Sequence, residues 1–477
     1  MPGDLVTALT ALLPAGAVLT VPADRVAYER DWRQLYADPA LCVVLPHSTA
    51  QVAVVVALCA AHQTPIVPQG GNTGLVAGGV PGPTVLPGTL PVVLNLSRMR
   101  QIVSIDTQGN TMLVQAGATL AAVQNAAAEA GRLFPVSLGA EGSAQIGGVI
   151  STNAGGVQVV KYGSMRAQVL GLEVVLPNGE VWNGLRALRK DNTGFDLKQI
   201  FIGGEGTLGI ITAATLALSP AITARATALV GVASVAAALR LFEALREGAG
   251  AALSLCELIC GPAMVLAAAH APGAKLPFTA ACYVLTELSG TGGGADVSAA
   301  LEAVLAAMLE NGVANDALIA QSDRERAALL ALREAVPEGE QREGGAVKHD
   351  VSVPLGEIPG LVAAVEALIA ARYPDCRLNI FGHLGDGNLH INIRPPMGQI
   401  VAALADVKAD ITRDVEALAV ARGGSFSAEH GIGRMRLAGM RAHKSTVELN
   451  LMRAIKRAID PSNLMNPGKM IPEDDQT

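Results

Sequence analysis

The sequence has few aromatic residues and no excess of positive charge. Aromatic side chains make up 3% of the 477 residues, and the formal net charge is −7. A protein that binds nucleic acid needs a basic surface, and single strands also need aromatic side chains on which the bases stack. The composition therefore excludes nucleic acid as a partner.

The cysteines form no recognisable pattern. There are six of them, at positions 42, 59, 256, 260, 282 and 376, and none stands in a Cys-x-x-Cys pair. Thiolate metal sites and disulfide frameworks both need regular, close spacings. We expect these cysteines to be small core residues in a reducing compartment. The N-terminus lacks the basic segment of a secretory signal, so the predicted location is the cytoplasm.

No uncharged run has the character of a membrane span. The longest, residues 206–224, contains Gly209 and Pro220, which favours a buried strand and loop over a transmembrane helix. We expect no transmembrane segment, although the apolar composition leaves a peripheral contact with a membrane open.

The ordered architecture is predicted to begin at residue 41. Residues 1–40 have the pattern of a helical lead-in, and a strand at 42–45, a helix at 49–62 and a strand at 65–68 follow. This is a β-α-β unit. With ~150 residues per domain as a guide, the chain has room for about three domains.

Three blocks rich in glycine follow, at residues 69–75, 139–163 and 203–211. The first has three glycines within five residues, which lets the backbone approach an anion such as a diphosphate and present N–H groups to it. Its spacing matches neither the Rossmann nor the P-loop pattern. The alternative for one such loop is a plain connector.

A second cluster of polar residues lies in the segment 381–393, Phe-Gly-His-Leu-Gly-Asp-Gly-Asn-Leu-His-Ile-Asn-Ile. Alternating flanks around a Gly-Asp-Gly-Asn centre predict a β-hairpin. If Leu384 pairs with Leu389, His383 pairs with His390, with Cβ atoms about 4.5–5.5 Å apart. Two imidazoles at that separation can share a metal ion. Asn392 would lie on the same face.

A third imidazole comes with a carboxylate in Ser427-Ala428-Glu429-His430-Gly431. Glu429 could complete a set of two histidines and one carboxylate, which leaves His430 as a base. The alternative is that all these residues are polar groups near the surface, but only 8 of the 477 residues are histidine.

The glycine blocks, over about residues 41–220, resemble the FAD-binding domain of the vanillyl-alcohol oxidase and p-cresol methylhydroxylase superfamily. The resemblance implies that the first block holds the diphosphate, and that the second lines the adenosine and the flavin ring. No His, Tyr or Cys stands in the first block and no obvious tether in 139–156, so we expect non-covalent FAD. The residues assigned to the FAD pocket are Pro68, Gly70, Gly71, Asn72, Thr73, Gly74, Leu75, Gly139, Gly142, Ser143, Gly147, Gly148, Asn153, Gly155, Gly156, Tyr162, Gly163, Glu205, Gly206, Ile211 and Asn466.

The predicted fold is α+β, with a two-part FAD-binding domain and an inserted cap domain. Strands alternate with helices after residue 221, which predicts a cap of ferredoxin-like type. The resemblance implies that the C-terminal tail folds back onto the FAD domain. The predicted division is a lead-in at 1–40, an FAD-binding domain at 41–220, a cap domain at 221–425 and a returning segment at 426–477.

The hairpin motif together with Glu429-His430-Gly431-Ile432-Gly433 resembles the FAD-dependent D-2-hydroxyacid dehydrogenases, which include D-lactate, D-2-hydroxyglutarate and glycolate enzymes. The resemblance implies that His383, His390 and Glu429 bind a divalent metal, zinc or manganese, and that His430 is the base. Such a metal would lower the pKa of the substrate hydroxyl while the hydride goes to flavin N5. An electron-transfer flavoprotein or a quinone would then accept the electrons, and a homodimer is compatible with the sequence.

The substrate prediction depends on two cations. Arg333 and Lys348 match carboxylate-binding positions of the 2-hydroxyglutarate-type members, and we place Asn392 beside them; solvated surface positions are the alternative. Relatives often have a hydroxyl residue four positions after the arginine, where this chain has Pro337, which brings no donor. We expect a diacid such as D-2-hydroxyglutarate or D-malate, with D-lactate or glycolate as alternatives. The rival hypotheses are a metal-dependent hydrolase with a nucleotide-binding domain and a non-catalytic assembly subunit.

Overall fold

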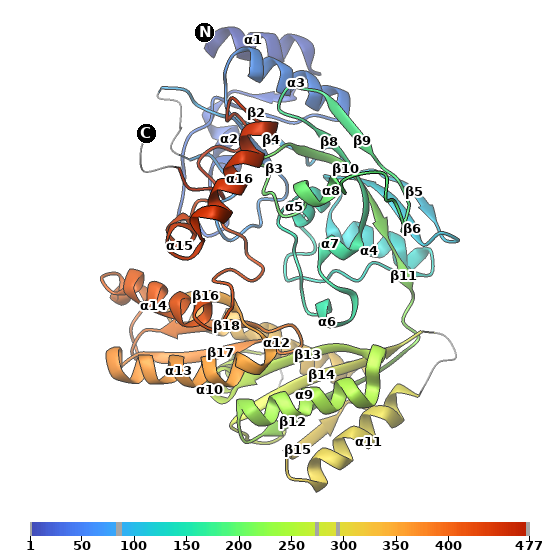
Figure 1. The fold of residues 1–477 in the computed structure, drawn as a ribbon, viewed down its shortest axis with the longest axis vertical. Coiled ribbons are helices and arrows are strands. Elements are labelled where there is room, and N and C mark those ends of the chain that lie inside the picture. Colours follow the sequence, from blue (N-terminus) through green and yellow to red (C-terminus); the bar gives the residue numbers. More distant parts are fainter. Residues whose placement is uncertain (1, 83–87, 272–275, 292–295, 474–477) are drawn as a thin grey trace. The chain divides into compact units, whose positions relative to one another are not determined.

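The computed structural model describes residues 2–82, 88–271, 276–291 and 296–473. The chain forms two compact units. The first unit comprises Met1–Gly155, Ser164–Ala221 and Glu429–Thr477, and the second comprises Gly156–Gly163 and Ile222–Ala428. Both units are thus built from segments that lie far apart in the sequence (Figure 1). Unlike the division expected from the sequence, residues 156–163 fold with the second unit.

The first unit contains a β-α-β arrangement where the sequence predicted one. The strand β2 (Cys42–Val44), the helix α3 (Thr49–Ala61) and the strand β3 (Ile66–Gln69) follow one another, and β2 and β3 both pair in parallel with β4 (Val92–Asn95). The helix begins after Ser48, whose hydroxyl accepts a hydrogen bond from the backbone N–H of Gln51. The elements of this unit are α1 (Pro2–Leu12), β1 (Val18–Leu19), α2 (Pro22–Glu29), β2 (Cys42–Val44), α3 (Thr49–Ala61), β3 (Ile66–Gln69), β4 (Val92–Asn95), β5 (Ile102–Asp106), β6 (Thr111–Gln115), α4 (Leu120–Glu129), β7 (Arg132–Leu133), α5 (Ile146–Ser151), α7 (Met165–Gln168), β8 (Val169–Val175), β9 (Val181–Gly184), α8 (Lys198–Phe201), β10 (Ile210–Ala217), β11 (Ser219–Pro220), α15 (Leu437–His443) and α16 (Thr446–Ile459).

The strands of the first unit form three sheets. Their orders are β1-β2-β4-β3, β5-β6-β10-β8-β9 and β11-β7. All eight residues of β10 are buried, so the prediction of a buried strand within the long uncharged run is confirmed. No helix in the described ranges is both long and apolar enough to cross a bilayer.

The second unit is built on one seven-stranded antiparallel sheet, in the order β15-β12-β14-β13-β17-β18-β16. Its elements are α6 (Val159–Tyr162), β12 (Ala224–Val232), α9 (Val235–Ala249), η1 (Gly250–Ala252), β13 (Leu253–Cys260), α10 (Gly261–His270), β14 (Cys282–Gly290), α11 (Val297–Glu310), β15 (Ala314–Ile319), α12 (Asp323–Arg342), β16 (Val347–Ser352), η2 (Leu355–Glu357), α13 (Ile358–Arg372), β17 (Arg377–His383), β18 (Asn388–Arg394), η3 (Val401–Leu404) and α14 (Lys408–Val420).

The two faces of this sheet are covered differently. Side chains alternate between the faces along each strand. Leu258 and Ile380 point to the face that packs against α9, α11, α13 and α14, whereas Ile259 and Phe381 point to the face that packs against α10 and α12. The candidate residues of the second unit lie on the α10 and α12 face.

The cysteines behave as the sequence indicated. All six are free thiols, four of them are buried, and Cys260 and Cys376 are half-buried.

Candidate active site

The three glycine blocks meet within the first unit. A Cβ atom added to Gly71 would lie 1.8 Å from the carbonyl oxygen of Ser143, so the backbones of the first and second blocks are in direct contact. A Cβ atom on Gly206 would lie 3.1 Å from Cγ of Pro68, the residue before the first block, which places the third block beside the start of the first. Side chains at Gly71 are sterically excluded, and the parts of the three blocks that belong to the first unit, residues 69–75, 139–155 and 203–211, lie close together.

Other glycines of the same blocks face open space. A Cβ atom on Gly74, Gly139, Gly142 or Gly148 would have no neighbour within 4 Å. Bare backbone beside open space is what a large, flat or extended ligand with phosphate groups requires. The site therefore fits a dinucleotide such as FAD.

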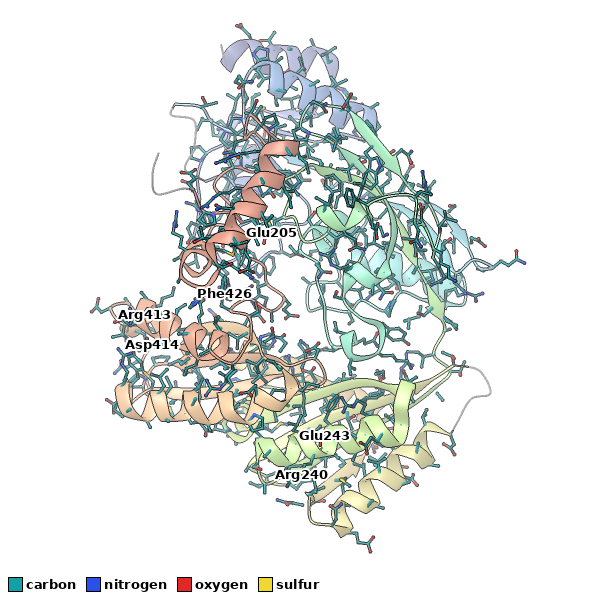
Figure 2. The ribbon with its side chains drawn as sticks, in the orientation of Figure 1. Glu205, Arg240, Glu243, Arg413, Asp414 and Phe426 are labelled. Atoms are coloured by element: carbon teal, nitrogen blue, oxygen red, sulfur yellow. The ribbon has the colours of Figure 1, made fainter. Side chains whose placement is uncertain are left out.

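Glu205, which is labelled in Figure 2, connects the C-terminal segment to these blocks. Its carboxylate accepts hydrogen bonds from the backbone N–H groups of Ile432 and Gly433, both at 2.7 Å. Burial raises the pKa of Glu205, and these two N–H donors offset part of the increase. The Asn466 side chain donates to the carbonyl oxygens of Glu205, at 2.8 Å, and of Gly78, at 3.0 Å. Glu205 and Asn466 thus connect the C-terminal segment with the third glycine block.

Lys469 is a buried cation in this unit and gives a pH prediction. Its ammonium donates to the carbonyl of Val80 and to Asn466 Oδ1. Burial first, and then Arg434, lower the pKa of Lys469 to about 7, whereas an unfolded lysine has a pKa of about 10.4. Between these values the unfolded chain binds more protons, so this residue makes the folded protein more stable as the pH rises from about 7 to about 10.

Lys469→Met is expected to remove that contribution. Melting temperatures of the wild type and the variant, measured by circular dichroism from pH 7 to pH 10, should show the wild type gaining stability relative to the variant as the pH rises. Melting curves that stay parallel across this range would show that Lys469 has an ordinary pKa.

The predicted FAD residues divide between the two units. Gly156, Tyr162 and Gly163 belong to the second unit, and the others belong to the first. The segment 156–163 packs closely against the hairpin, because a Cβ atom on Gly385 would lie 2.7 Å from Cγ2 of Val160. A pocket of about 350 Å³ in the second unit adjoins both, but it contains none of the predicted metal or substrate residues.

The hairpin at 381–393 is present, but its predicted register is wrong. Phe381 pairs with His390 and His383 pairs with Asn388, so the loop has four residues, 384–387. Leu384 is fully buried in the core, and the Asp386 carboxylate accepts the N–H of Asn388 at 3.2 Å, which closes the longer loop.

The two histidines nevertheless remain neighbours. His383 and His390 occupy diagonal positions on the same face of the sheet. Their ring centroids are 5.8 Å apart. Two imidazoles are therefore available on one face, as the metal hypothesis requires.

His383 is held by a buried carboxylate that sequence reasoning missed. Glu257, on β13, is fully buried and accepts a hydrogen bond from Nδ1 of His383 at 2.5 Å. Its other oxygen accepts from Nε of Arg333 at 2.5 Å. Burial alone would raise the pKa of Glu257, but His383 and Arg333 lower it to about 2. Glu257 is therefore an anion.

Arg333 and Lys348 are not free surface cations. The Arg333 side chain is 13% exposed, and its guanidinium lies 4.7 Å from the ring centroid of Phe381. The surface alternative is therefore wrong for Arg333. The Lys348 side chain is 31% exposed, and Nζ lies 3.3 Å from Glu340.

Glu340 is the second carboxylate that sequence reasoning missed. It is fully buried on α12 and accepts hydrogen bonds from the side-chain amides of Asn379 and Asn392, at 3.2 and 2.9 Å. Asn392 and Lys348 are paired in the sheet, and both side chains contact Glu340. Glu340 therefore binds two of the predicted substrate residues. The helix α12 continues through Pro337.

The remaining candidates, Glu429 and His430, directly follow Ala428, the last residue of the second unit. The strands β16 and β18 come first. Asp350 pairs with His390 in the sheet, and its carboxylate lies 3.9 Å from Nδ1 of that histidine. The backbone N–H of Ala428 donates to the Asp350 carbonyl. Glu429 is the next residue along the chain and begins the last segment of the first unit.

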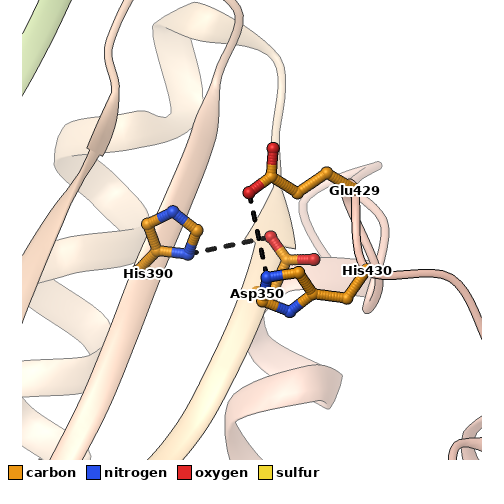
Figure 3. A group of neighbouring side chains, drawn as sticks. All are labelled: Asp350, His390, Glu429 and His430. Carbon is orange, nitrogen blue, oxygen red and sulfur yellow. Dashed lines mark ion pairs between the residues drawn. The ribbon is translucent and has the colours of Figure 1, made fainter. Parts of the chain in front are cut away.

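Figure 3 shows Asp350, His390, Glu429 and His430 with two ion pairs, His390 to Asp350 and His430 to Glu429, the latter at 3.8 Å. Each of these side chains offers a nitrogen or oxygen atom of a type that binds metal ions. Asp350 is a further residue that sequence reasoning did not single out.

His349 has a structural role, in agreement with its omission from the candidate site. It is buried, and its ring nitrogens contact the Ile391 carbonyl at 2.7 Å and the Thr412 hydroxyl at 3.3 Å.

Family models match both parts of the chain. Residues 40–184 match the FAD binding domain, and residues 222–470 match the C-terminal domain of FAD linked oxidases. Two relatives illustrate the similarity over the full length. D-2-hydroxyglutarate dehydrogenase of Xanthomonas citri pv. viticola is 38% identical, with 98% of this chain and 96% of that protein covered. The mitochondrial D-2-hydroxyglutarate dehydrogenase of Bos taurus is 36% identical, with 98% and 84% covered.

Solved structures share the fold at low identity. p-Cresol methylhydroxylase aligns with a TM-score of 0.75 and 19% identity, covering 99% of this chain and 97% of that one. Alkyldihydroxyacetonephosphate synthase aligns with a TM-score of 0.74 and 18% identity, covering 98% and 84%. The predicted fold class is confirmed.

Proposed function

We propose, for a chain that belongs to the D-2-hydroxyglutarate dehydrogenase family of FAD-linked oxidases, that it oxidises a D-2-hydroxy diacid to the 2-oxoacid. D-2-hydroxyglutarate is the first candidate and D-malate the second. The observation that supports a diacid is the pair of cations, Arg333 and Lys348, held by buried carboxylates on the same sheet face as His383 and His390. D-lactate and glycolate have one carboxylate each, so one of the two cations would have no substrate carboxylate to bind.

Non-covalent FAD is the proposed cofactor. When bound, FAD supplies the two-electron acceptor for the oxidation. The chain contributes the bare backbone at Gly74, Gly139, Gly142 and Gly148, against which the cofactor would lie. Glu205 contributes indirectly, because it fixes the backbone at Ile432 and Gly433.

A divalent metal ion, zinc or manganese, is proposed at His383, His390 and Glu429. When bound, it supplies positive charge beside the substrate hydroxyl. Two imidazoles on one face of the sheet and the carboxylate of Glu429 are nitrogen and oxygen ligands of the type that zinc binds in catalytic sites.

The remaining side chains bind the substrate and move its proton. We assign His430 as the base that accepts the hydroxyl proton, since an unperturbed imidazole has a pKa of about 6.5. Arg333 uses Nε for Glu257, and the other guanidinium N–H groups point in different directions and can bind a carboxylate. Lys348 and Asn392 would bind the second carboxylate.

The proposal extends to partners and location. An electron-transfer flavoprotein or a quinone would reoxidise the protein, and a homodimer is compatible with it. A cytoplasmic location stays a prediction from the cysteines, and relatives include mitochondrial proteins.

A substrate panel tests the proposed function. Turnover with an artificial electron acceptor should be faster for D-2-hydroxyglutarate or D-malate than for D-lactate, glycolate or any L-2-hydroxyacid. Lys348→Met is expected to lower kcat/KM for the diacid about 10- to 100-fold, because a hydrogen bond to a charged group contributes about 1.5–3 kcal/mol. Turnover of D-lactate should change little. Equal losses for diacid and monoacid would contradict the assignment of Lys348.

A further inference from the structure

Two buried glutamates lie on neighbouring strands and have nearly the same surroundings. Glu257 on β13 is 0% exposed, and Glu287 on β14 is 2% exposed. Each accepts a hydrogen bond at 2.5 Å from the Nε of an arginine on α12, Arg333 for Glu257 and Arg326 for Glu287. The two arginines are seven residues apart, which is about two helical turns and therefore the same side of the helix.

The two glutamates differ in their second partner. Glu287 accepts a hydrogen bond from the Thr227 hydroxyl at 2.8 Å, whereas Glu257 accepts one from Nδ1 of His383. A function in the candidate site is therefore available to Glu257 and not to Glu287, although both stabilise the same sheet and helix.

The contact with Glu257 determines which nitrogen of His383 can bind a metal. A carboxylate paired with a guanidinium accepts hydrogen bonds, so Nδ1 of His383 carries a proton, and in the neutral imidazole the lone pair is then on Nε2. Carboxylates fix ligand histidines of metal sites in this manner, and their loss typically weakens metal binding about 10- to 100-fold.

The same carboxylate fixes the substrate cation. Oε2 of Glu257 binds Nε of Arg333, and the guanidinium stacks on Phe381. Because a guanidinium is planar, these two contacts set the direction of its remaining N–H groups.

We propose that Glu257 is a positioning residue that makes Nε2 of His383 the metal-binding nitrogen and aims Arg333 at the substrate carboxylate. This inference rests on the proposed function. The register adds support, since Glu257 and His383 are direct partners between β13 and β17 and are held at this separation by the sheet itself.

Glu257→Gln gives a specific test. Arg333 can only donate, so the carbonyl oxygen of the new amide must face Arg333, and its NH₂ group then faces His383. Nδ1 of His383 must become an acceptor, and the proton moves to Nε2, the nitrogen that the metal needs. Glu287→Gln is the matched control, because it removes the same charge from the neighbouring buried pair.

Two measurements on FAD-loaded protein read out this change. Nitrogen-15 NMR of labelled histidines in the metal-free protein, with His383→Gln to assign the signal, should show Nδ1–H in the wild type and in Glu287→Gln, and Nε2–H in Glu257→Gln. Competition with a zinc chelator should give about 10- to 100-fold weaker zinc binding for Glu257→Gln and unchanged binding for Glu287→Gln.

The results separate this inference from the proposed function. Wild-type protein that oxidises no 2-hydroxyacid and binds no zinc would contradict the proposed function. Active, zinc-binding wild type whose His383 carries its proton on Nε2 would overturn the role of Glu257, and that measurement does not depend on the folding of Glu257→Gln. Zinc binding by Glu257→Gln equal to that of the wild type would overturn it as well.

Discussion

Replacing His383 by Ala is expected to abolish metal binding and to lower kcat with D-2-hydroxyglutarate by at least about 1,000-fold, which corresponds to about 4 kcal/mol of transition-state stabilisation. His383 is one of two imidazoles on the candidate face. The FAD content should stay at the wild-type level. The glycines proposed to line the cofactor, Gly74, Gly139, Gly142 and Gly148, belong to the first unit, whereas His383 belongs to the second. Metal analysis, the visible spectrum and turnover of the same preparation measure all three effects.

His349→Gln is the control for this prediction. His349 is a buried histidine on the neighbouring strand β16 and contacts a backbone carbonyl and a threonine hydroxyl. Its replacement should lower the melting temperature and leave the metal content unchanged. If His383→Ala retains metal and turnover, His383 is not a ligand; turnover that persists after loss of the metal would remove the metal from the reaction.

His430→Gln is expected to lower kcat by about 10²- to 10⁴-fold, the usual contribution of a general base. Metal and FAD contents should remain those of the wild type, since His430 is assigned to the proton and not to the metal. Added imidazole should restore part of the activity of His430→Ala, because the small alanine side chain leaves room for the added base. Steady-state kinetics with and without imidazole measure this.

The adjacent residue provides the comparison. Glu429→Gln should lose the metal, whereas His430→Gln should keep it. The reverse result would exchange the roles of the two residues, and a kcat within threefold of the wild type for His430→Gln would rule out His430 as the base.

Individual helices and strands, and the family, could be predicted from the sequence because each depends on residues that are close together in the chain. Ser48 caps α3, alternation identifies β17 and β18, and glycine blocks with characteristic spacing identify the FAD-binding domain. The register of the hairpin was not readable, because it depends on the burial of Leu384 in a core formed by helices from elsewhere in the chain.

The buried carboxylates were missed for a related reason. Glu257 is the one charged residue in the strand Leu253–Cys260, and a charge inside a buried strand must have a partner. That signal was available. The identity of the partners was not, since Arg333 and His383 are 76 and 126 residues away in the sequence. The same holds for Glu340 and Asn392, which are 52 residues apart.

The proposed transfer of electrons from a D-2-hydroxy diacid to FAD can be tested by the absorbance of the flavin, which falls when FAD is reduced. FAD-loaded, zinc- or manganese-loaded protein is mixed anaerobically with D-2-hydroxyglutarate, L-2-hydroxyglutarate or D-lactate while the flavin absorbance is followed. D-2-hydroxyglutarate should bleach the flavin rapidly, D-lactate should bleach it more slowly, and the L-enantiomer should not bleach it. A flavin that stays oxidised with every D-2-hydroxyacid would contradict the proposed electron transfer.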